Sequence, residues 1–591
     1  MPSTLKSPGA PGPDSRTRVS APSKTSSSKT IPFPDRVAAL SSFTLFAIFF
    51  AALAVTHLTL LHLPYFWDEG GYYIPAALDF YHRFTLIPEF TNAHPPLPNV
   101  VLGTLWHITG YNILTTRLTV CAFAAAALLA VFRLTQRLLS PAAALATTLL
   151  TAVYPIWFAQ STLAHADIFA AAFTLSAFAL YLPLATPQNC HPEHREGSAS
   201  RSQRHKLIWI AALFSLAALS KETAIVEPAI LAAIELTRTI RVPRVRILGP
   251  GSSPGPKSPA GTHLHRLLAL SFPLLPLLTW YAYHRHKTGF TFGNPEYLRY
   301  NATANFTAAH IFQAIYYRSL HLFWQRNIWL AILLALACLL LPRRNSLSPT
   351  LYPLSPVLPT IALLIAGNWL AFSILGGALL TRYLLPVYPL ILLLCVATWR
   401  DRTRQWPALA AATGAAFFVA IWLNPPTAFA PEDNLTYRDM IVVHQEAAAY
   451  ITQHYPDATV LTAWPAASEL FRPELGYVPQ RLKVDAIENF TSAEINKAAQ
   501  TPDKFDTALV FTTHYTSPAL ERYLLKHPTT LRGREFTQDR DLRPSEIAAI
   551  LGGQIVFQDN RDGEWAAVIR FSRSYEARLS QPELKCSMRN R

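Results

Sequence analysis

The stretch VAALSSFTLFAIFFAALAVTHLTLLHL, residues 37–63, sets the fold class because it contains no Asp, Glu, Lys or Arg. A membrane-spanning helix needs about 20 consecutive apolar residues, whereas the apolar core of a cleavable signal peptide has only about 7–15. The run is long enough to cross a bilayer and too long for a signal-peptide core. We therefore expect an uncleaved first membrane helix, preceded by a basic cytoplasmic tail.

Similar uncharged blocks recur along the chain and predict an all-α polytopic transmembrane bundle. Of the 591 residues, 51% are hydrophobic and 15% are charged, whereas soluble domains usually carry about 25% charged residues. This composition excludes an ordinary soluble protein, a disordered chain and a collagen-like fibre. The eleven predicted spans are 37–63, 115–134, 142–158, 167–184, 207–220, 223–237, 267–283, 327–341, 356–375, 382–398 and 407–424.

The positive charge of the chain fixes the expected orientation. The formal net charge is +15, and a strongly basic chain sometimes binds nucleic acid. Here the basic residues lie between the apolar blocks, with 23 Lys and Arg in the segments predicted inside and 7 in the outer segments before the last domain. This bias follows the positive-inside rule, so we expect membrane lipids as partners and no nucleic acid. An odd number of spans then places the C-terminal region outside.

Three parts follow from these patterns: a disordered cytoplasmic tail (1–35), a transmembrane domain (36–425) and an extracytoplasmic α/β domain (426–591). The five cysteines show no spacing typical of a disulfide framework or a zinc site. In the last part we predict helices at 437–453 and 544–552, strands at 458–463 and 507–513, and a hairpin around residues 561–563. This small domain shows no phosphate-binding loop, and we expect it to stabilise or recognise something near the membrane.

The ionisable residues gather at the outer ends of the predicted spans. Asp68 and Glu69 follow the first span, Asp167 enters the fourth, and Glu222 lies between the fifth and sixth; Glu227 is the main charge inside a span. A proton-coupled transporter would place such groups near the bilayer midplane. The pattern instead favours a site at the outer membrane surface.

The first outer loop carries the densest group of candidates, WDEGGYY at 67–73 and HPPL at 94–97. Adjacent side chains on a helix point about 100° apart, so Asp68 and Glu69 are expected to differ in role. One of them would be a general base, and the other would hold a helix end or a metal. The alternative is that Asp68 caps the helix that starts at Glu69.

These motifs resemble those of the membrane glycosyltransferases of the GT-C class. The similarity is closest to the branch that holds protein O-mannosyltransferases and the aminoarabinose transferase that modifies lipid A. Three later segments fit the same resemblance: AHADIF at 164–169, LSKETA at 219–224 and RYLLPVYP at 382–389. The resemblance covers about residues 36–425, and the outer C-terminal domain suits the same architecture.

The resemblance implies a sugar transfer, with inversion, from a polyprenyl-phosphate donor to an acceptor hydroxyl at the outer face. It makes Asp68 the candidate catalytic base or acceptor-orienting carboxylate. Glu69 would support Asp68, and Asp167 would position the acceptor or a metal. The expected substrate-binding residues are Tyr72, Tyr73, His94, Lys221, Glu222, Arg382 and Tyr383.

Cations are expected among these residues because the departing phosphate is an anion. His94 stands where some relatives have Lys, and histidine is only partly charged near neutral pH. Lys221 could instead be the salt-bridge partner of Glu222 or Glu227, and Arg382 could be an anchor at the membrane interface. No cofactor is expected with certainty beyond a possible divalent cation whose ligands the sequence does not specify.

The expected function is therefore an integral membrane glycosyltransferase that uses a polyprenyl-phosphate-linked sugar, with a lipid, protein or glycan as acceptor. Its expected location is the bacterial inner membrane, with the site and the C-terminal domain facing outside. A competing enzyme function is the transfer of an oligosaccharide or a phosphosugar by a relative with the same topology. A lipid-linked-sugar transporter is disfavoured by the scarcity of charge inside the spans. A non-catalytic scaffold would tolerate loss of Asp68.

Overall fold

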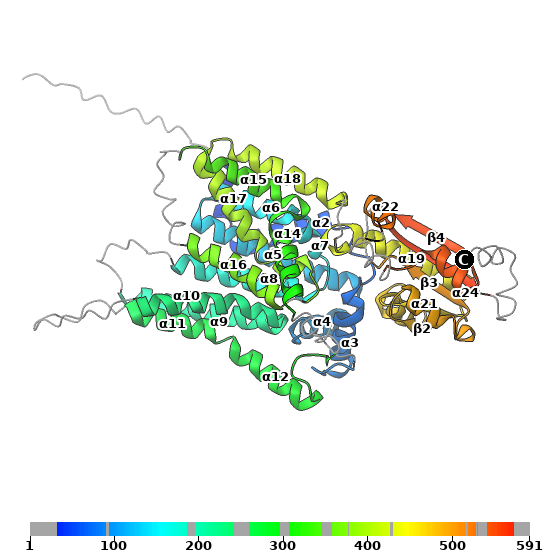
Figure 1. Ribbon diagram of the computed structural model, residues 1–591. Helices are drawn as coiled ribbons and strands as arrows, with labels where there is room; N and C mark the ends of the chain where they lie inside the picture. Colours follow the sequence, from blue (N-terminus) through cyan, green and yellow to red (C-terminus); the bar gives the residue numbers. More distant parts are fainter. Residues whose placement is uncertain are drawn as a thin grey trace, which may run out of the picture.

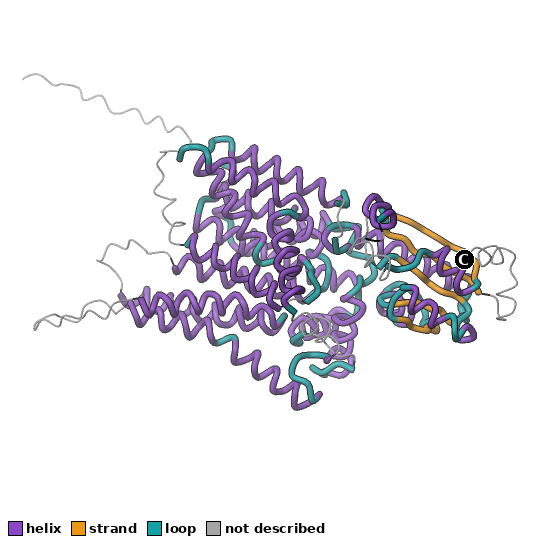
Figure 2. The backbone as a smooth tube through the Cα atoms, viewed as in Figure 1, coloured by secondary structure: helices purple, strands orange, loops and turns teal. Residues whose placement is uncertain are grey.

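The chain forms a long helical body with a smaller, sheet-containing domain at one end (Figures 1 and 2). The predicted fold class, a transmembrane helical bundle with a small C-terminal α/β domain, is confirmed. The computed structural model describes residues 32–89, 94–185, 196–241, 259–295, 307–343, 357–375, 377–425, 429–513, 518–527, 529 and 540–571. Most of the predicted disordered tail lies outside the described residues.

The first apolar run is a broken helix, so the prediction of one continuous span is wrong. Helix α1 (Phe33–Ala39) and helix α2 (Ser42–Thr56) meet at an angle of 113°. The break has a local cause, because the Ser41 hydroxyl accepts a hydrogen bond of 3.0 Å from the Thr44 amide and caps the start of α2. Helix α1 also begins inside the segment predicted to be a disordered tail.

The remaining apolar blocks form most of the helical body. Proline shows why a predicted span breaks: Pro155 lacks an amide donor and starts a new helix where the span 142–158 was expected to continue. The helices of the body after α2 are α3 (Ile74–Arg83), α4 (Leu97–Thr109), α5 (Ile113–Leu138), α6 (Pro141–Val153), α7 (Pro155–Gln160), α8 (Ala166–Tyr181), α9 (Glu196–Ser220), α10 (Val226–Arg241), α11 (Pro259–Ser271), α12 (Leu274–Thr288), α14 (Ala308–Phe323), α15 (Ile328–Leu339), α16 (Leu358–Leu375), α17 (Tyr388–Arg402) and α18 (Trp406–Trp422).

Several of these helices are long and apolar enough to cross a membrane. In the described part of the chain, five qualify by length and composition, or six if the bent α1–α2 pair is one span. Two of the five combine neighbouring helices, α11 with α12 and α14 with α15. Shorter apolar helices, among them α6 and α18, complete the body. The protein is a multi-pass integral membrane protein, and the number of eleven spans stays a prediction.

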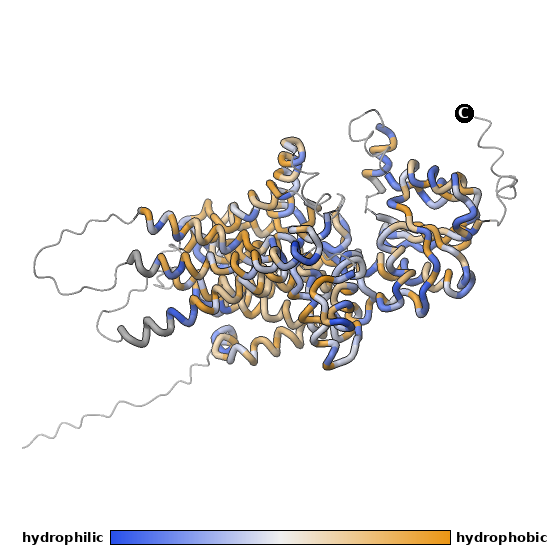
Figure 3. Tube along the Cα trace, turned by 90° about the horizontal axis from the view of Figure 1, so that it is seen from below, coloured by the Kyte–Doolittle hydropathy of each residue, from blue (hydrophilic) through white to orange (hydrophobic). Residues whose placement is uncertain are grey.

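The helical body is built mostly of apolar residues, whereas the C-terminal domain mixes apolar and polar residues (Figure 3). Large apolar side chains point outward from the body, such as Phe43 with 80% and Leu340 with 89% of its surface exposed. In water such a surface would be unfavourable, whereas lipid tails accommodate it. The exposed apolar surface therefore matches a body surrounded by hydrocarbon.

The C-terminal domain is a five-stranded mixed sheet with the strand order β2-β1-β3-β5-β4. Strands β2, β1 and β3 run parallel to one another, and β5 pairs antiparallel with both β3 and β4. The strands are β1 (Thr459–Ala463), β2 (Lys483–Ile487), β3 (Thr507–Phe511), β4 (Gly553–Arg561) and β5 (Glu564–Phe571). The helices are α19 (Thr436–His454), α20 (Ala466–Phe471), α21 (Ser492–Ala498), α22 (Pro518–Lys526) and α24 (Pro544–Leu551).

Every element that the sequence predicted in this domain is present. The hairpin turn has Asp562 and Gly563 at φ of 48° and 96°, a conformation that Asp and Gly adopt most easily. Strand β2 was not predicted; it lies at the sheet edge, and none of its residues is fully buried. Every residue of β3 is buried, which matches its continuous apolar sequence.

The C-terminal domain is joined to the first outer loop by hydrogen bonds. The Tyr65 amide donates to the Leu475 carbonyl at 3.1 Å, and the Tyr477 hydroxyl donates to the Tyr65 carbonyl at 3.2 Å. The hydroxyls of Tyr437 in α19 and Thr162 in the body lie 3.1 Å apart. These contacts bring the domain against the loop that carries the WDEGGYY motif.

Candidate active site

The last five residues of the WDEGGYY motif, Glu69–Tyr73, form one wide π-helical turn, which continues into α3. Trp67, directly before this turn, has a φ of 45°, a left-handed conformation that is rare for a bulky residue. Asp68 stands at the start of the turn, but its side chain makes no capping hydrogen bond there. A role for Asp68 as a helix cap is therefore not supported. Its carboxylate instead accepts a hydrogen bond from Arg382.

Arg382 is the centre of the candidate site. Its two terminal nitrogens donate to Asp68 and to Glu432, and its Nε lies 3.3 Å from Oδ2 of Asp167. The three carboxylates come from the first outer loop, the start of α8 and the segment after α18. The Arg382 side chain is only 3% exposed, so it is not an anchor that extends into the membrane interface. One guanidinium thus holds together three parts of the chain that are distant in sequence.

Asp167 also binds Lys221, whose Nζ lies 2.5 Å from Oδ1. The structure thus gives Lys221 a different partner from Glu222 and Glu227, the two acids that its sequence neighbourhood suggested. The Lys221 ammonium also lies 3.8 Å from the centre of the Tyr383 ring, within the range of a cation–π contact. Glu222 pairs instead with His94, whose Nδ1 lies 2.9 Å from the carboxylate.

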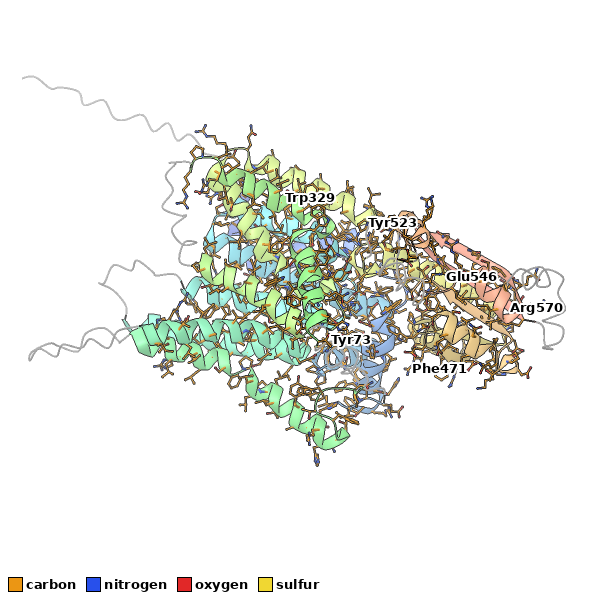
Figure 4. The ribbon with its side chains drawn as sticks, viewed as in Figure 1. Tyr73, Trp329, Phe471, Tyr523, Glu546 and Arg570 are labelled. Atoms are coloured by element: carbon orange, nitrogen blue, oxygen red, sulfur yellow. The ribbon has the colours of Figure 1, made fainter. Side chains whose placement is uncertain are left out.

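The side chains of His94 and Tyr73 pack against each other in the candidate site. Their rings stack at a centroid distance of 5.8 Å and an interplanar angle of 10°. Burial, assisted by the negative charge of Asp167, raises the pKa of Tyr73 well above its usual value, so the phenol stays a neutral hydrogen-bonding group. Tyr73 lies on the side of the helical body that faces the C-terminal domain (Figure 4).

Glu69 has a different environment from Asp68. Its side chain is fully buried and accepts hydrogen bonds from the Phe66 amide at 2.7 Å, the Ala164 amide at 2.5 Å and Arg117 at 2.5 Å. Arg117 also donates to the carbonyls of Pro64 and Thr162, both at 2.7 Å. The Glu69–Arg117 pair therefore fastens the loop of Asp68 to the loop that precedes Asp167.

Sequence reasoning missed Arg117, although a charge at the outer end of an apolar span is a recognisable signal. It also missed Arg318 in α14, which is fully buried and donates to the carbonyls of Leu380 at 2.6 Å and Ala378 at 3.3 Å. Its guanidinium carbon lies 5.3 Å from the centre of the Tyr383 ring. Within the described residues, no carboxylate forms an ion pair with Arg318. Among the described residues, its positive charge is therefore not neutralised by a carboxylate.

Glu432 and Asp433 are two further residues that the sequence reasoning missed. They follow α18, so the rule that singled out Asp68 would also have singled them out, but they fall beyond the predicted boundary at residue 426. Burial, which outweighs the attraction of Arg382, raises the pKa of Glu432 to about 7. Burial likewise raises the pKa of Asp433 to about 6, and this carboxylate accepts a hydrogen bond from Thr381.

The structure brings together most of the predicted site residues, with Asp68, Asp167, Lys221, Arg382 and Tyr383 at the centre. Asp68 differs from the others because its side chain is 19% exposed, whereas the side chains of Asp167, Lys221 and Arg382 are 5% exposed or less. Of the three acids around Arg382, Asp68 is therefore the one that solvent can reach. Tyr72 lies to one side, where its ring is 6.3 Å from that of Trp464 in the C-terminal domain.

The described residues of the candidate site offer no evident set of ligands for a divalent cation. Among the described residues, no group of three or more His, Cys, Asp or Glu side chains is arranged to hold a metal ion. The carboxylates of Asp68, Asp167 and Glu432 are neutralised by Arg382 and Lys221 instead. The described residues therefore do not fit the divalent cation whose ligands the sequence did not specify.

Comparison with known proteins gives one family match. Residues 93–245 match the family described as dolichyl-phosphate-mannose-protein mannosyltransferase, a segment that contains His94, Asp167, Lys221 and Glu222. None of the curated proteins matches the chain.

Two solved structures show a similar arrangement at low identity. ArnT from Cupriavidus metallidurans bound to undecaprenyl phosphate is 14% identical, with 90% of this chain and 98% of that chain covered and a TM-score of 0.49. The oligosaccharyltransferase of Archaeoglobus fulgidus in the apo form is 12% identical, with 90% of this chain and 74% of that chain covered and a TM-score of 0.42. At this level of similarity, neither structure says what this chain binds.

The family match and the membrane fold together indicate a membrane glycosyltransferase. The predicted resemblance to the GT-C class is confirmed. Within that class, residues 93–245 match the family described as dolichyl-phosphate-mannose-protein mannosyltransferase.

Proposed function

We propose that the protein transfers a sugar from a polyprenyl-phosphate donor to an acceptor hydroxyl at the outer membrane face. The observation that carries the proposal is the set of three carboxylates around the buried Arg382, Asp68, Asp167 and Glu432, of which Asp68, the candidate base, is the one with a partly exposed side chain. The family match supports a lipid-phosphate-linked donor. The excess of Lys and Arg in the predicted inner loops supports the outer location of the site, and a bacterial inner membrane is the location that we propose for the protein.

In the proposed reaction, the acceptor oxygen attacks the anomeric carbon of the donor sugar while the bond from that carbon to the phosphate oxygen breaks. Asp68 takes the hydroxyl proton, and the polyprenyl phosphate leaves as an anion. A single displacement inverts the configuration at the anomeric carbon. Proton removal by a positioned side chain typically contributes about 10²–10⁴-fold to the rate.

The leaving phosphate needs positive charge at a fixed position. Lys221 and Arg318 both approach the Tyr383 ring, and Arg318 has no ionic partner among the described residues. We therefore assign the donor phosphate to the region beside Tyr383, with Arg318 as its main cation. Arg382 has a different proposed role: its three carboxylate contacts make it the group that holds Asp68 in place.

The test uses membranes that contain the protein, labelled polyprenyl-phosphate sugars and mass analysis of the product. Asp68→Asn should lower transfer by about 10²–10⁴-fold. Asp79→Asn is the matched control, because Asp79 is also an acid of the outer region but pairs with Arg83 on α3. Movement of the lipid-linked sugar without a covalent product would favour the transporter. Wild-type transfer in Asp68→Asn would reject Asp68 as the base.

A further inference from the structure

Three aromatic side chains meet where the first outer loop contacts the C-terminal domain. The Trp67 and Trp464 rings are 4.8 Å apart at 79°, and the Tyr72 and Trp464 rings are 6.3 Å apart at 50°. We refer to Trp67, Tyr72 and Trp464 as the aromatic cluster. All three side chains are partly exposed, so their rings are not enclosed in a core.

The backbone around the cluster is adapted to it. Trp67 keeps its left-handed φ of 45°, although this conformation costs a bulky residue about 1–2 kcal/mol. Trp464 lies directly against Gly71, where an added Cβ would be 2.9 Å from the indole nitrogen. A side chain at position 71 would push the indole away. Backbone strain of this kind is concentrated at functional sites.

The cluster borders the candidate base. Trp67 directly precedes Asp68, and Tyr72 follows Asp68 by four residues in the helical turn that starts at Glu69. Asp68 therefore lies between Trp67 and Tyr72 in the chain, and the Trp464 ring of the C-terminal domain contacts the rings of both. A molecule that stacks on these rings would have its polar groups near Asp68.

We propose that the aromatic cluster is the acceptor subsite and that it binds a pyranose ring of a saccharide acceptor. This inference rests on the proposed function and specifies its acceptor class. The C–H groups on the face of a sugar ring carry partial positive charge and are attracted to the negative face of an aromatic ring. The sugar hydroxyls at the ring edge then point to the side, where Asp68 accepts a proton.

A lipid and a peptide acceptor fit the cluster less well. A phosphorylated lipid headgroup requires a cation that can bind it, whereas Arg382, the cation beside Asp68, already contacts three carboxylates. A peptide acceptor requires free backbone partners, but the neighbouring Tyr65 amide and carbonyl are bonded to Leu475 and Tyr477. What the cluster presents is aromatic surface, which suits a sugar ring.

The experiment compares transfer to acceptor with hydrolysis of the donor by water. Membranes containing wild type or Trp464→Ala receive labelled polyprenyl-phosphate sugars, and the products are separated into saccharide-linked, protein-linked and lipid-alcohol-linked fractions. We expect wild type to label a saccharide hydroxyl. Trp464→Ala should lower this transfer at least about tenfold, with donor hydrolysis within about twofold of wild type. Trp464→Phe, which keeps a smaller aromatic face, should lie between the two.

Tyr523→Ala is the control, because Tyr523 is an exposed aromatic residue of the same domain (58% exposed), on helix α22 (Figure 4). It should leave both reactions unchanged. Label on Ser, Thr or a lipid alcohol would overturn the inference, as would unchanged transfer in Trp464→Ala or an equal loss of transfer and hydrolysis. If wild type shows neither transfer nor hydrolysis, the proposed function itself fails.

Discussion

The replacement Arg382→Lys tests whether one guanidinium positions the candidate base. Arg382 contacts Asp68, Asp167 and Glu432 with three different nitrogens. A lysine ammonium is a single charged centre on a flexible stem and lacks this planar fork. The substitution keeps the charge but should lose about two of the three contacts. At about 1.5–3 kcal/mol for a hydrogen bond to a charged group, about 3–6 kcal/mol of local interaction is lost.

Most of this loss should appear in catalysis, because Asp68 would no longer be held at a fixed point. A displacement of about 1 Å at a reacting group costs about 10²-fold in rate. We expect Arg382→Lys to lower kcat for transfer by about 10²-fold or more while KM for the donor changes little. The assay is sugar transfer at varied donor concentration in lipid, with thermal unfolding of the same samples measured in parallel.

Arg137→Lys is the matched control, since Arg137 in α5 donates to a single carbonyl, that of Ala179, at 2.7 Å. It should leave both constants unchanged. A raised donor KM with a normal kcat in Arg382→Lys would place Arg382 on the donor phosphate, as the sequence motif implied, and would refute the positioning role. Wild-type values for both constants would refute it as well.

Further predictions concern the neighbours of Arg382. Burial raises the pKa of Glu432 from 4.5 to about 7, so the folded protein binds the Glu432 proton more tightly than the unfolded chain does. The stability that this protonated group contributes is present at low pH and is lost as pH rises through about 7. Glu432→Gln should remove this part of the pH dependence of the thermal midpoint, and an unaltered pH profile would contradict it. Glu69→Gln should destabilise the protein by about 3–5 kcal/mol, because it leaves the buried Arg117 unpaired; thermal unfolding in detergent would show this, and a wild-type midpoint would exclude it. Lys497→Cys, at a position 75% exposed in the C-terminal domain, should react with a membrane-impermeant thiol reagent without permeabilisation; reaction only afterwards would reverse the predicted orientation.

The class of protein and the composition of the site could be predicted from the sequence. Charge-free runs near membrane length require helices, because backbone groups in hydrocarbon must bond internally. Alternating apolar residues and the turn at residues 561–563 predicted the C-terminal elements. Acids and bases at the outer span ends stood out because charge inside the bilayer is costly. Motif resemblance then suggested roles for Asp68, Asp167 and Arg382.

Which of these charges pair with one another depends on the packing of the helices. Asp68 and Arg382 are 314 residues apart in sequence, and no local pattern indicates that they meet. The same holds for Asp167, which binds Lys221, and for Glu432, which reaches the site from the start of the C-terminal domain. Ion pairs of this kind depend on distance and burial, and both follow from the tertiary structure. The sequence therefore identified the candidate charged residues, whereas the tertiary structure decided that Asp68 is partly exposed and Glu69 is fully buried.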